Sequence, residues 1–364
     1  MTRLLTYNEI DRTEWSRLVR ESATGTWFQT PEAFDFFMSM PQLFKPFCIA
    51  VAEQTISDER FAMKGVCVGY MTVEKPAIRQ YFTRRAILLG GPCLADDATN
   101  EEVGMLMDAV RQQWKNGPIY IETRNFNDYS RWKDAFEQSG FNYRPHLNFH
   151  VDCTDKEVMW ERLSENRRRQ IKKISASNAC SMSCEQGLLN EPLSRNDEVT
   201  EQDIREWYAI LAELYRTKVK TPLWPVEFFL EAYRQGVGKF MLVKHEGKVI
   251  GGSMVVVFTG KEKSDSAHEG AVYEWFECGL NNEYKEQYPS VKATWKGMEY
   301  ANAHACARYD MMGAGMPGVP YGVRDFKSEF GGKLVEQGRF LCICKPILYQ
   351  IGVMGIKCIR KFSA

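Results

Sequence analysis

One pattern of strands and helices occurs twice in this chain, and this repeat constrains the fold more than any other feature. The clearest match is a β-hairpin, written FCIAVAEQ…GVCVGYMTVEK in the first half and FMLVKHEGKVIGGSMVVVF in the second. The two copies begin at Phe47 and Phe240, about 190 residues apart. After each hairpin, the hydrophobic spacing predicts a strand, a helix, a strand, a helix and a closing strand. A duplication of this length predicts an α/β protein of two similar domains, each with a mixed central sheet flanked by helices.

The repeat also predicts the domain limits. We expect a first domain over residues 1–152 and a second over residues 153–345, with a helical insert at the start of the second. Residues 346–364 form a tail that carries apolar residues together with Lys357, Arg360 and Lys361. This composition predicts an amphipathic helix that docks either on the protein or on a membrane surface.

Charge and cysteine content exclude several classes of protein. Lys+Arg and Asp+Glu both number 47, so no global field draws the protein onto nucleic acid or membrane, and anions must be bound by local clusters. The 11 cysteines include no CxxC pair and have no histidine at ligand spacing, so we expect reduced thiols and no metal site. The N-terminus lacks the apolar run of a secretory signal, and no apolar stretch approaches the ~20 residues of a membrane helix. We therefore expect a cytoplasmic protein.

Four segments, taken together and in order, resemble the Fem-type family of peptidoglycan-precursor aminoacyltransferases within the GNAT superfamily. They are WFQTPEAFDFF at Trp27–Phe37, ENRRRQIKKI at Glu165–Ile174, LYRTKVKTPLWPVEFF at Leu214–Phe229 and YDMMGAG…GVRDFKSEFGG at Tyr309–Gly332. The resemblance covers most of the chain, and it implies two tandem GNAT-like domains.

The resemblance also implies an activity, which is transfer of an acyl or aminoacyl group to an amine of a cell-wall precursor or related glycan. The donor is either aminoacyl-tRNA or acyl-CoA, and no tightly bound cofactor is expected. The Q/R-x-x-G-x-G/A loop of acetyl-CoA-dependent GNATs is replaced by GLNNEYKEQYPSVKATWKG, and the sequence has no long coiled-coil arm of the kind that some family members insert for tRNA. Both donors therefore stay open, as do two alternatives: an acyl-CoA N-acyltransferase acting on a small amine or sugar, and a non-catalytic scaffold at the inner membrane face.

The strongest catalytic candidates lie in the last matching segment. The resemblance places Phe326 and Lys327 where Fem-type enzymes use an aromatic–lysine pair near the acceptor, and a lysine there can stabilise negative charge or hold a phosphate. Spacing alone favours a solvated lysine on a short surface helix. Asp310 ends a predicted strand, where it either orients the amine or caps a loop.

Other polar and aromatic residues are candidates for substrate binding. The basic run after Glu165 is either a solvated helix or a surface that binds the phosphates of tRNA, a nucleotide sugar or a lipid diphosphate. Tyr273 and Trp275 alternate on a predicted strand, so we expect both on one face. The full set of expected substrate-binding residues is Gln29, Arg167, Arg168, Lys218, Lys220, Tyr273, Trp275, Tyr321 and Phe326. The expected partners are an anionic nucleotide- or lipid-linked precursor, tRNA, and a membrane surface met by the tail.

Overall fold

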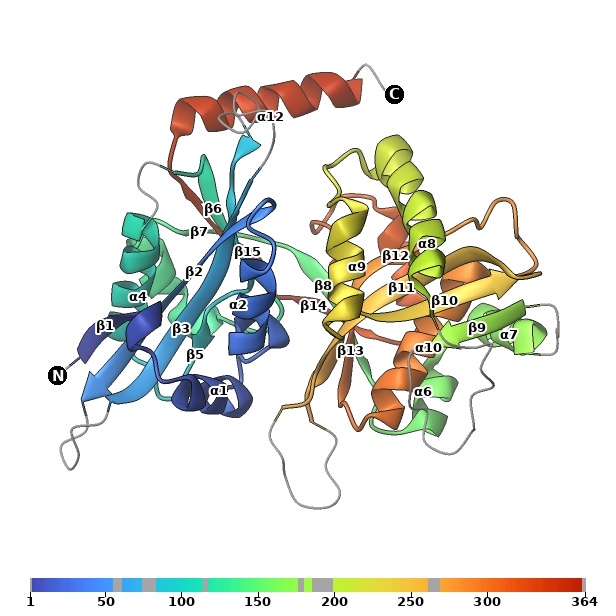
Figure 1. Cartoon of the computed structure of the whole chain (residues 1–364), viewed down its shortest axis with the longest axis horizontal. Helices are drawn as coiled ribbons and strands as arrows, with labels where there is room; N and C mark the ends of the chain where they lie inside the picture. The colour runs from blue at the N-terminus through green and yellow to red at the C-terminus, as the bar shows by residue number, and fades with distance from the viewer. Residues whose placement is uncertain are drawn as a thin grey trace. The chain divides into compact units, whose positions relative to one another are not determined.

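The computed structural model describes residues 2–54, 61–73, 83–113, 117–175, 180–184, 199–260 and 269–361. The chain forms two compact units (Figure 1). Unit 1 contains Met1–His146 and Glu336–Ala364, and unit 2 contains Leu147–Val335. No helix in the described part of the chain has both the length and the apolar character needed to cross a bilayer.

Unit 1 is built on an eight-stranded mixed sheet in the order β1-β2-β3-β4-β6-β15-β7, with β5 paired to β3. The strands β4 and β6 run parallel, whereas β15 runs antiparallel to both β6 and β7. The strands are β1 (Thr2–Thr6), β2 (Phe44–Gln54), β3 (Phe61–Thr72), β4 (Ala86–Gly90), β5 (Cys93–Leu94), β6 (Tyr120–Asn125), β7 (Asn142–Arg144) and β15 (Arg339–Ile343).

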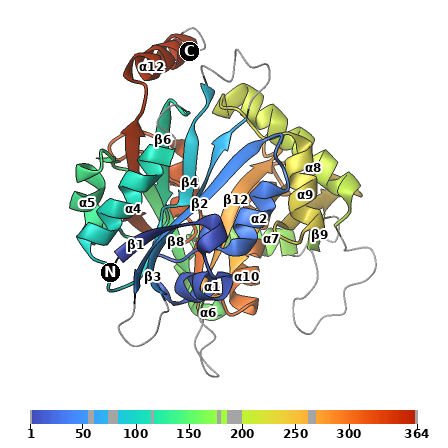
Figure 2. The same cartoon turned by 60° about the vertical axis from the view of Figure 1, so that its left-hand side comes forward.

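Helices pack on both faces of this sheet. The α-helices are α1 (Arg12–Glu21), α2 (Pro31–Met38), α4 (Asn100–Gln113), α5 (Lys133–Gln138) and α12 (Pro346–Lys361), and single turns η1, η2 and η3 span Tyr7–Glu9, Trp27–Gln29 and Ser130–Trp132. The helices α4 and α5 lie side by side on one face, where Leu106 and Phe136 join Ile121 in the main core (Figure 2). The helices α1 and α2 pack on β2 and β3 from the other face, where the rings of Phe37 and Tyr70 lie 4.7 Å apart.

Unit 2 is built on a seven-stranded sheet in the order β14-β8-β13-β12-β11-β10-β9. Its strands are β8 (Leu147–Asp152), β9 (Cys180–Cys184), β10 (Lys239–His245), β11 (Lys248–Phe258), β12 (Ala271–Gly279), β13 (Arg308–Asp310) and β14 (Lys333–Glu336). Its helices are α6 (Lys156–Arg162), α7 (Glu165–Ser175), α8 (Glu201–Leu214), the π-helical turn η4 (Tyr215–Val219), α9 (Val226–Arg234), α10 (Pro289–Ala303) and α11 (Gly322–Ser328). The core joins the sheet to α10, with Met298 and Val291 packed near Val272.

The second hairpin forms as the sequence predicts. His245 pairs with Lys248, and the two residues between them, Glu246 and Gly247, both have positive φ angles of 51° and 79°. Two consecutive left-handed residues form the turn that matches the twist of a tight hairpin.

The two sheets repeat one strand order, with one strand exchanged between the two halves of the sequence. After its first strand, the unit 1 sheet has the hairpin β2-β3, the parallel pair β4-β6, the inserted strand β15 and the edge strand β7. Read from β9, the unit 2 sheet has the matching hairpin β10-β11, pair β12-β13, inserted strand β8 and edge strand β14. The inserted strand is β15 in unit 1, drawn red among blue and teal strands in Figure 1, and β8 in unit 2. The expected limits at residues 152 and 345 therefore do not coincide with the compact units, because residues 147–152 pair with β13 and residues 339–343 pair with β6 and β7. The predicted α/β architecture of two similar units, each with a mixed sheet flanked by helices, is confirmed.

Candidate functional site

A group of buried charged side chains lies at the C-terminal end of β13 in unit 2. Asp310, the last residue of β13, is fully buried. Its Oδ1 accepts hydrogen bonds from Asn148 Nδ2 at 2.7 Å and from the Met312 backbone N–H at 2.9 Å, and His150 Nε2 lies 3.1 Å from its Oδ2. Asp310 thus fixes the start of the loop that follows β13, which makes it part of the framework on which the site is built.

The pKa of Asp310 reflects these contacts. Burial by itself raises the pKa, but the hydrogen bond and charge of His150, together with Arg308 and Asn148, outweigh burial and hold the pKa below its usual value. Asp310 is therefore a carboxylate at neutral pH and not a proton donor.

Lys327 enters the same region from α11. Its side chain is only 9% exposed, and its Nζ donates hydrogen bonds to the backbone carbonyls of Met311 and Gly313, the latter at 2.9 Å. Burial lowers the pKa of Lys327, and the charges of Glu274, Glu277 and Asp310 oppose that effect. The solvated surface lysine that spacing alone favours is therefore wrong. An ammonium group has three donors, so one remains for a further partner.

A β-bulge in β12 brings two glutamates to the same face of the sheet. Glu274 lies opposite Val255 and Phe276 opposite Met254, so Trp275 is an extra residue without a partner on β11. Because Glu277 lies opposite Ser253, two positions from Val255, Glu277 shares the face of Glu274. A regular strand would place residues three apart on opposite faces. Trp275 has no partner on β11, so strand alternation does not settle whether it shares the face of Tyr273, and that expectation stays a prediction.

Glu274 is buried and fully engaged. Its Oε1 accepts hydrogen bonds from Thr294 Oγ1 of α10 at 3.0 Å and from the Tyr309 hydroxyl at 2.9 Å. A Cβ atom at Gly297 would lie 2.5 Å from the Tyr309 hydroxyl, so a glycine in α10 makes room for this contact. Burial raises the pKa of Glu274, against the opposing charge of Lys327.

Glu277 is the least satisfied of these groups. Burial, reinforced by the charge of Glu274, raises its pKa to about 7, although a hydrogen bond with Ser290 opposes the shift. Its Oε1 is buried and has no hydrogen-bond partner among the described residues. A carboxylate with a free oxygen and a pKa near neutrality can accept and return a proton.

Two of the expected binding residues, Phe326 and Arg167, contact each other. The guanidinium of Arg167 lies 4.6 Å from the ring centroid of Phe326 and 5.1 Å from that of Phe330. Its Nε lies 3.5 Å from Glu329 Oε2, and burial lowers the pKa of Arg167. Arg167 thus joins α7 to α11 by cation–π contacts and is not a free phosphate ligand on a basic surface.

The other expected binding residues lie in different surroundings. Arg168 Nη1 donates to the Glu161 carbonyl at 2.7 Å, and Tyr321 is an exposed residue at the start of α11. Lys218 and Lys220 are exposed at and just after η4, where Lys220 has a left-handed φ of 55°. The structure therefore does not join Lys218 and Lys220 to the buried Lys327 in one cluster.

Two further candidates are buried in packed surroundings. Gln29 is 0% exposed, its Nε2 donates to the Gly91 carbonyl at 2.7 Å, and its Oε1 accepts from Thr26 Oγ1. Gln29 thus links η2 by a hydrogen bond to the residue after β4, and because its side chain is fully buried it does not line a cleft as expected. Tyr273 is also 0% exposed, with its hydroxyl 3.3 Å from Arg308 Nη2, while Trp275 packs on Phe228.

Sequence reasoning missed both glutamates of β12. The available signal was their position, because Glu274 and Glu277 stand inside the apolar strand AVYEWFECG, and charged residues are rarely buried without a partner. Within the described residues, no group of three His, Cys, Asp or Glu side chains could hold a metal ion.

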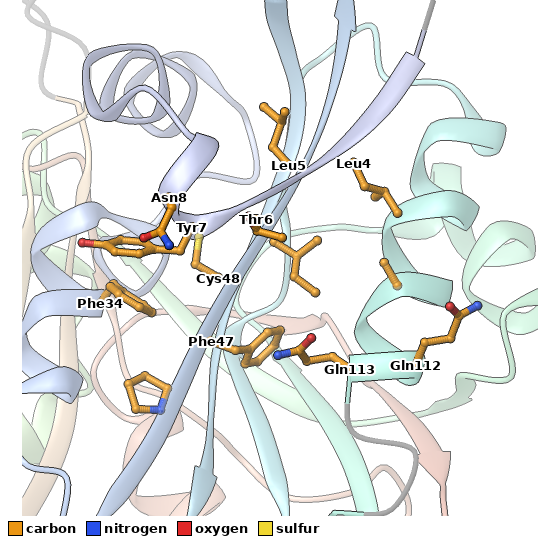
Figure 3. Close-up of a pocket in the computed structure, with 13 residues that line it drawn as sticks. Leu4, Leu5, Thr6, Tyr7, Asn8, Phe34, Phe47, Cys48, Gln112 and Gln113 are labelled. Atoms are coloured by element: carbon orange, nitrogen blue, oxygen red, sulfur yellow. The ribbon is translucent and has the colours of Figure 1, made fainter.

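Unit 1 contains a separate pocket of about 610 Å³, where β1 ends against β2 and α4 (Figure 3). Its lining combines apolar side chains such as Leu4 and Phe47 with the amides of Asn8, Gln112 and Gln113. Among the described residues, no charged side chain lines it. These lining residues offer an anionic precursor no counter-charge, so the pocket lends no support to a site for the expected acceptor.

Comparisons with known proteins agree with this architecture. The FemAB family model matches residues 268–354, which hold β12, α10, β13, α11 and the exchanged strand β15. A search against curated proteins found no significant match.

Solved structures match along nearly the whole chain. A structure described as FemX has a TM-score of 0.65 at 12% identity, covering 96% of this chain and 99% of that one. A tandem GNAT protein from the clavulanic acid biosynthesis pathway has a TM-score of 0.52 at 9% identity, covering 94% and 99%. The C-terminal domain of a putative lysylphosphatidylglycerol synthetase from Agrobacterium fabrum has a TM-score of 0.50 at 10% identity, covering 94% of each chain. The Fem-type resemblance is thus confirmed over residues 268–354, and the fold is that of FemX and of a tandem GNAT protein.

Proposed function

We propose that this chain, which matches the FemAB family model over residues 268–354 and shares the fold of FemX, forms an amide on an amine of a cell-wall precursor or related glycan. The donor is an activated aminoacyl group carried by tRNA. Transfer takes place beside the charged group of unit 2, with Lys327 and Glu277 as the residues that act on the reacting atoms.

One observation carries this proposal: Lys327 and Glu274 are buried, Glu277 is half-buried with a buried Oε1 atom, and the three charges act on one another. Burying charge is costly unless the charges are paired. A low-dielectric site also strengthens each electrostatic interaction with a developing charge. Lys327 and Glu277 each retain unused hydrogen-bonding capacity, which a structural ion pair does not need.

The chemistry follows from these two groups. The acceptor ammonium first releases one proton to solvent. Its neutral amine then attacks the ester carbonyl of the donor, and Glu277 accepts the proton that the attacking nitrogen gives up. The remaining N–H of Lys327 donates to the oxyanion as the C–N bond forms. When the C–O bond to the tRNA ribose breaks, Glu277 returns the proton to the leaving oxygen. The proton that moves from the attacking nitrogen to the leaving oxygen is thus carried by one carboxylate whose pKa is close to the working pH.

The start of α10 supports aminoacyl-tRNA over acyl-CoA as the donor. The first turn of a helix after a strand is a ready place for the diphosphate of coenzyme A. Here Asn281 occupies that turn, because its Oδ1 accepts from the Ser290 backbone N–H at 3.3 Å and its Nδ2 donates to Ser290 Oγ at 2.7 Å. Glu277 also contacts Ser290, and its carboxylate would repel a diphosphate.

The tail supports a peripheral membrane contact by the same protein. Ile347, Ile351 and Met354 are exposed along α12, and their spacing of four and three residues places them on one side of the helix. The side chains of Lys357, Arg360 and Lys361 lie outside the described residues, but the sequence from residue 337 to 361 contains no Asp or Glu. An apolar stripe within a basic segment suits an anionic lipid surface. The protein would then work at the inner face of the membrane.

A donor screen tests the proposal. The purified protein is offered a set of aminoacyl-tRNAs and a set of acyl-CoAs with a precursor amine, and the product is identified by mass spectrometry. We expect an amide from aminoacyl-tRNA, its loss in Lys327→Met, and its retention in Arg17→Gln, which changes an exposed arginine of α1. A product from acyl-CoA alone would favour the N-acyltransferase alternative. The absence of product from every donor would favour the non-catalytic scaffold.

A further inference from the structure

Three arginines lie in register across three neighbouring strands of unit 1. Arg339 of β15 is the Cα partner of Arg124 of β6 on one side and of Arg144 of β7 on the other. Directly opposite residues share a face of the sheet, so these side chains form one row, which we call the arginine row. Because Ile121 points into the core under α4, alternation places Arg124 on the face opposite α4.

Like charges directly opposite each other destabilise a sheet. Unit 2 avoids such an arrangement on its corresponding strands, where β13 and β8 pair Arg308 with Asp152 and Asp310 with His150. On these corresponding strands, unit 2 thus pairs an arginine with an aspartate and an aspartate with a histidine, whereas unit 1 places three guanidinium groups side by side. The arginine row therefore has no counterpart in the unit that carries the buried lysine.

Among the described residues, a single carboxylate, Glu122, forms ion pairs with the row. Arg124 Nε lies 2.9 Å from Glu122 Oε2, and Arg339 Nη1 lies 3.2 Å from Glu122 Oε1. Burial by itself raises the pKa of Glu122, but Arg124 and Arg339 outweigh burial and lower the pKa to about 2. Glu122 is therefore always charged near neutral pH, and it offsets only one of the positive charges.

A fourth guanidinium adds to this surplus. Arg85 hydrogen-bonds to Tyr120, which belongs to the same cluster, and its charge acts on Tyr70 alongside that of Arg124. The Nε atom of Arg85 is buried without a hydrogen-bond partner in the described structure. A buried donor without an acceptor is uncommon and needs an explanation, such as an anion that binds there.

We propose that the arginine row, with Arg85, binds a diphosphate group. Neighbouring strands lie ~4.8 Å apart, so Arg124 and Arg339 can each hold one of two adjacent phosphoryl groups. The side chains of Arg124 and Arg339 keep 36% and 28% of their surface exposed, which leaves them open to an anion from solution. Both residues are half-buried, and this favours a small anion over the broad surface of an RNA duplex.

This inference rests on the proposed function for the identity of the ligand, because a cell-wall precursor carries its diphosphate next to either a nucleoside or a lipid. The site adjoins the helix proposed to meet the membrane, since the ring of Tyr349 in α12 lies 5.7 Å from that of Tyr120. Both sources share the diphosphate chemistry, and the two arms of the test separate them.

Calorimetry with inorganic pyrophosphate on the full chain tests the site. We expect Arg124→Gln with Arg339→Gln to weaken pyrophosphate binding at least tenfold, and orthophosphate to bind more weakly than pyrophosphate. Arg144 is an exposed member of the row and forms no ion pair among the described residues, so Arg144→Gln provides a second test if the double variant folds poorly. We expect Arg144→Gln to weaken pyrophosphate binding severalfold. The matched control is Arg17→Gln, whose ion pairs with Glu14 and Glu21 lie on the surface of α1.

A nucleoside diphosphate sugar and a short prenyl diphosphate form the two further arms. Tighter binding of the first than of pyrophosphate assigns the nucleotide-linked source, and tighter binding of the second assigns the lipid-linked source. Pyrophosphate affinity that is unchanged in Arg144→Gln and in the folded double variant would overturn the site, as would binding of an RNA hairpin to the row without pyrophosphate binding. If pyrophosphate binds at the row but no donor gives a product, this site stands and the proposed function fails. If transfer occurs but the arginine variants bind pyrophosphate as tightly as the wild type, the proposed function stands and this site fails.

Discussion

The two units place opposite kinds of side chain at the same point of one fold. Gly140 and Gly331, with φ angles of 84° and 76°, each follow the short helix after the corresponding strands β6 and β13. Four residues earlier stand Phe136 in unit 1 and Lys327 in unit 2. Phe136 stacks on Phe340 with ring centroids 4.1 Å apart, inside an apolar core.

The difference between Phe136 and Lys327 shows which of the two side-chain types the fold itself requires at this position. Unit 1 shows that this architecture is stable with an aromatic residue at that point, so the buried charge of Lys327 is not needed for folding. A charged centre that costs stability without a structural need is best explained by function. The following predictions test this comparison, from the largest expected effect to the smallest.

Exchanging the residue type in unit 1 should have the largest effect. Phe136→Lys buries an ammonium group in a core where the described neighbours are apolar, and it also removes a packed ring. We expect a loss of more than about 5 kcal/mol of unfolding free energy, measured by urea denaturation, because an unpaired buried charge adds to the cost of the lost side chain. Phe136→Leu is the control and should stay folded. A stable Phe136→Lys protein would show that the position is not equivalent to a sealed core.

The reverse exchange in unit 2 should separate stability from activity. Lys327→Met should reduce turnover by about 10²-fold or more and cost about 3–5 kcal/mol, because Glu274 and Glu277 lose their cation. Adding Glu274→Gln and Glu277→Gln removes the two glutamate charges that Lys327 offsets, and should restore much of the stability while the protein stays inactive. Activity in this triple variant would contradict the functional reading of the charged centre.

Acidification should stabilise unit 2 through Glu277. Its pKa in the folded protein, about 7, is raised above the ordinary value of 4.5, so the folded state binds the proton more tightly. The contribution to stability is complete below pH 4.5 and is lost as the pH rises through 7, with a slope that approaches about 1.4 kcal/mol per pH unit for one proton. The measurement is the difference in unfolding free energy between the wild type and Glu277→Gln at several pH values. The same variant should remove a pKa near 7 from the pH profile of kcat/KM.

The smallest expected effect concerns a glycine in each of two corresponding helices. Gly297→Ala in α10 places a Cβ 2.5 Å from the Tyr309 hydroxyl, so it should cost about 1–3 kcal/mol and disturb the hydrogen bond to Glu274. In Gly104→Ala of α4, the nearest atom to the new Cβ is Ser139 Oγ at 3.9 Å, so the change should stabilise by up to about 1 kcal/mol through helix propensity. Thermal unfolding of both variants measures the contrast, and effects of equal sign would argue against a special contact in α10.

Much of the fold was predictable from local patterns, because apolar spacing and turn residues act over short distances. The hairpin around Glu246 and Gly247, the duplication and the place of Asp310 at the end of a strand followed from these patterns, whereas Lys327 became a candidate only through the family resemblance. The exchange of β8 and β15 was not predictable, since strand pairing between distant segments leaves no local pattern. The bulge at Trp275 was missed for a related reason. One extra residue in an apolar strand moves every later side chain to the other face of the sheet, but it does not change the composition of the strand. The roles of Asp310 and Lys327 in catalysis remain predictions.

The late position of β15 has a consequence for how the protein is made. When a ribosome has finished β7, the first sheet still lacks its inserted strand, which arrives only after the intervening chain up to residue 339 is translated, on the order of ten to forty seconds later. During that interval the edges of β6 and β7 are unpaired and open to aggregation. Arg124 and Arg144 then stand at a vacant seam in the nascent chain, where their charge would discourage another strand from settling there before the proper one does.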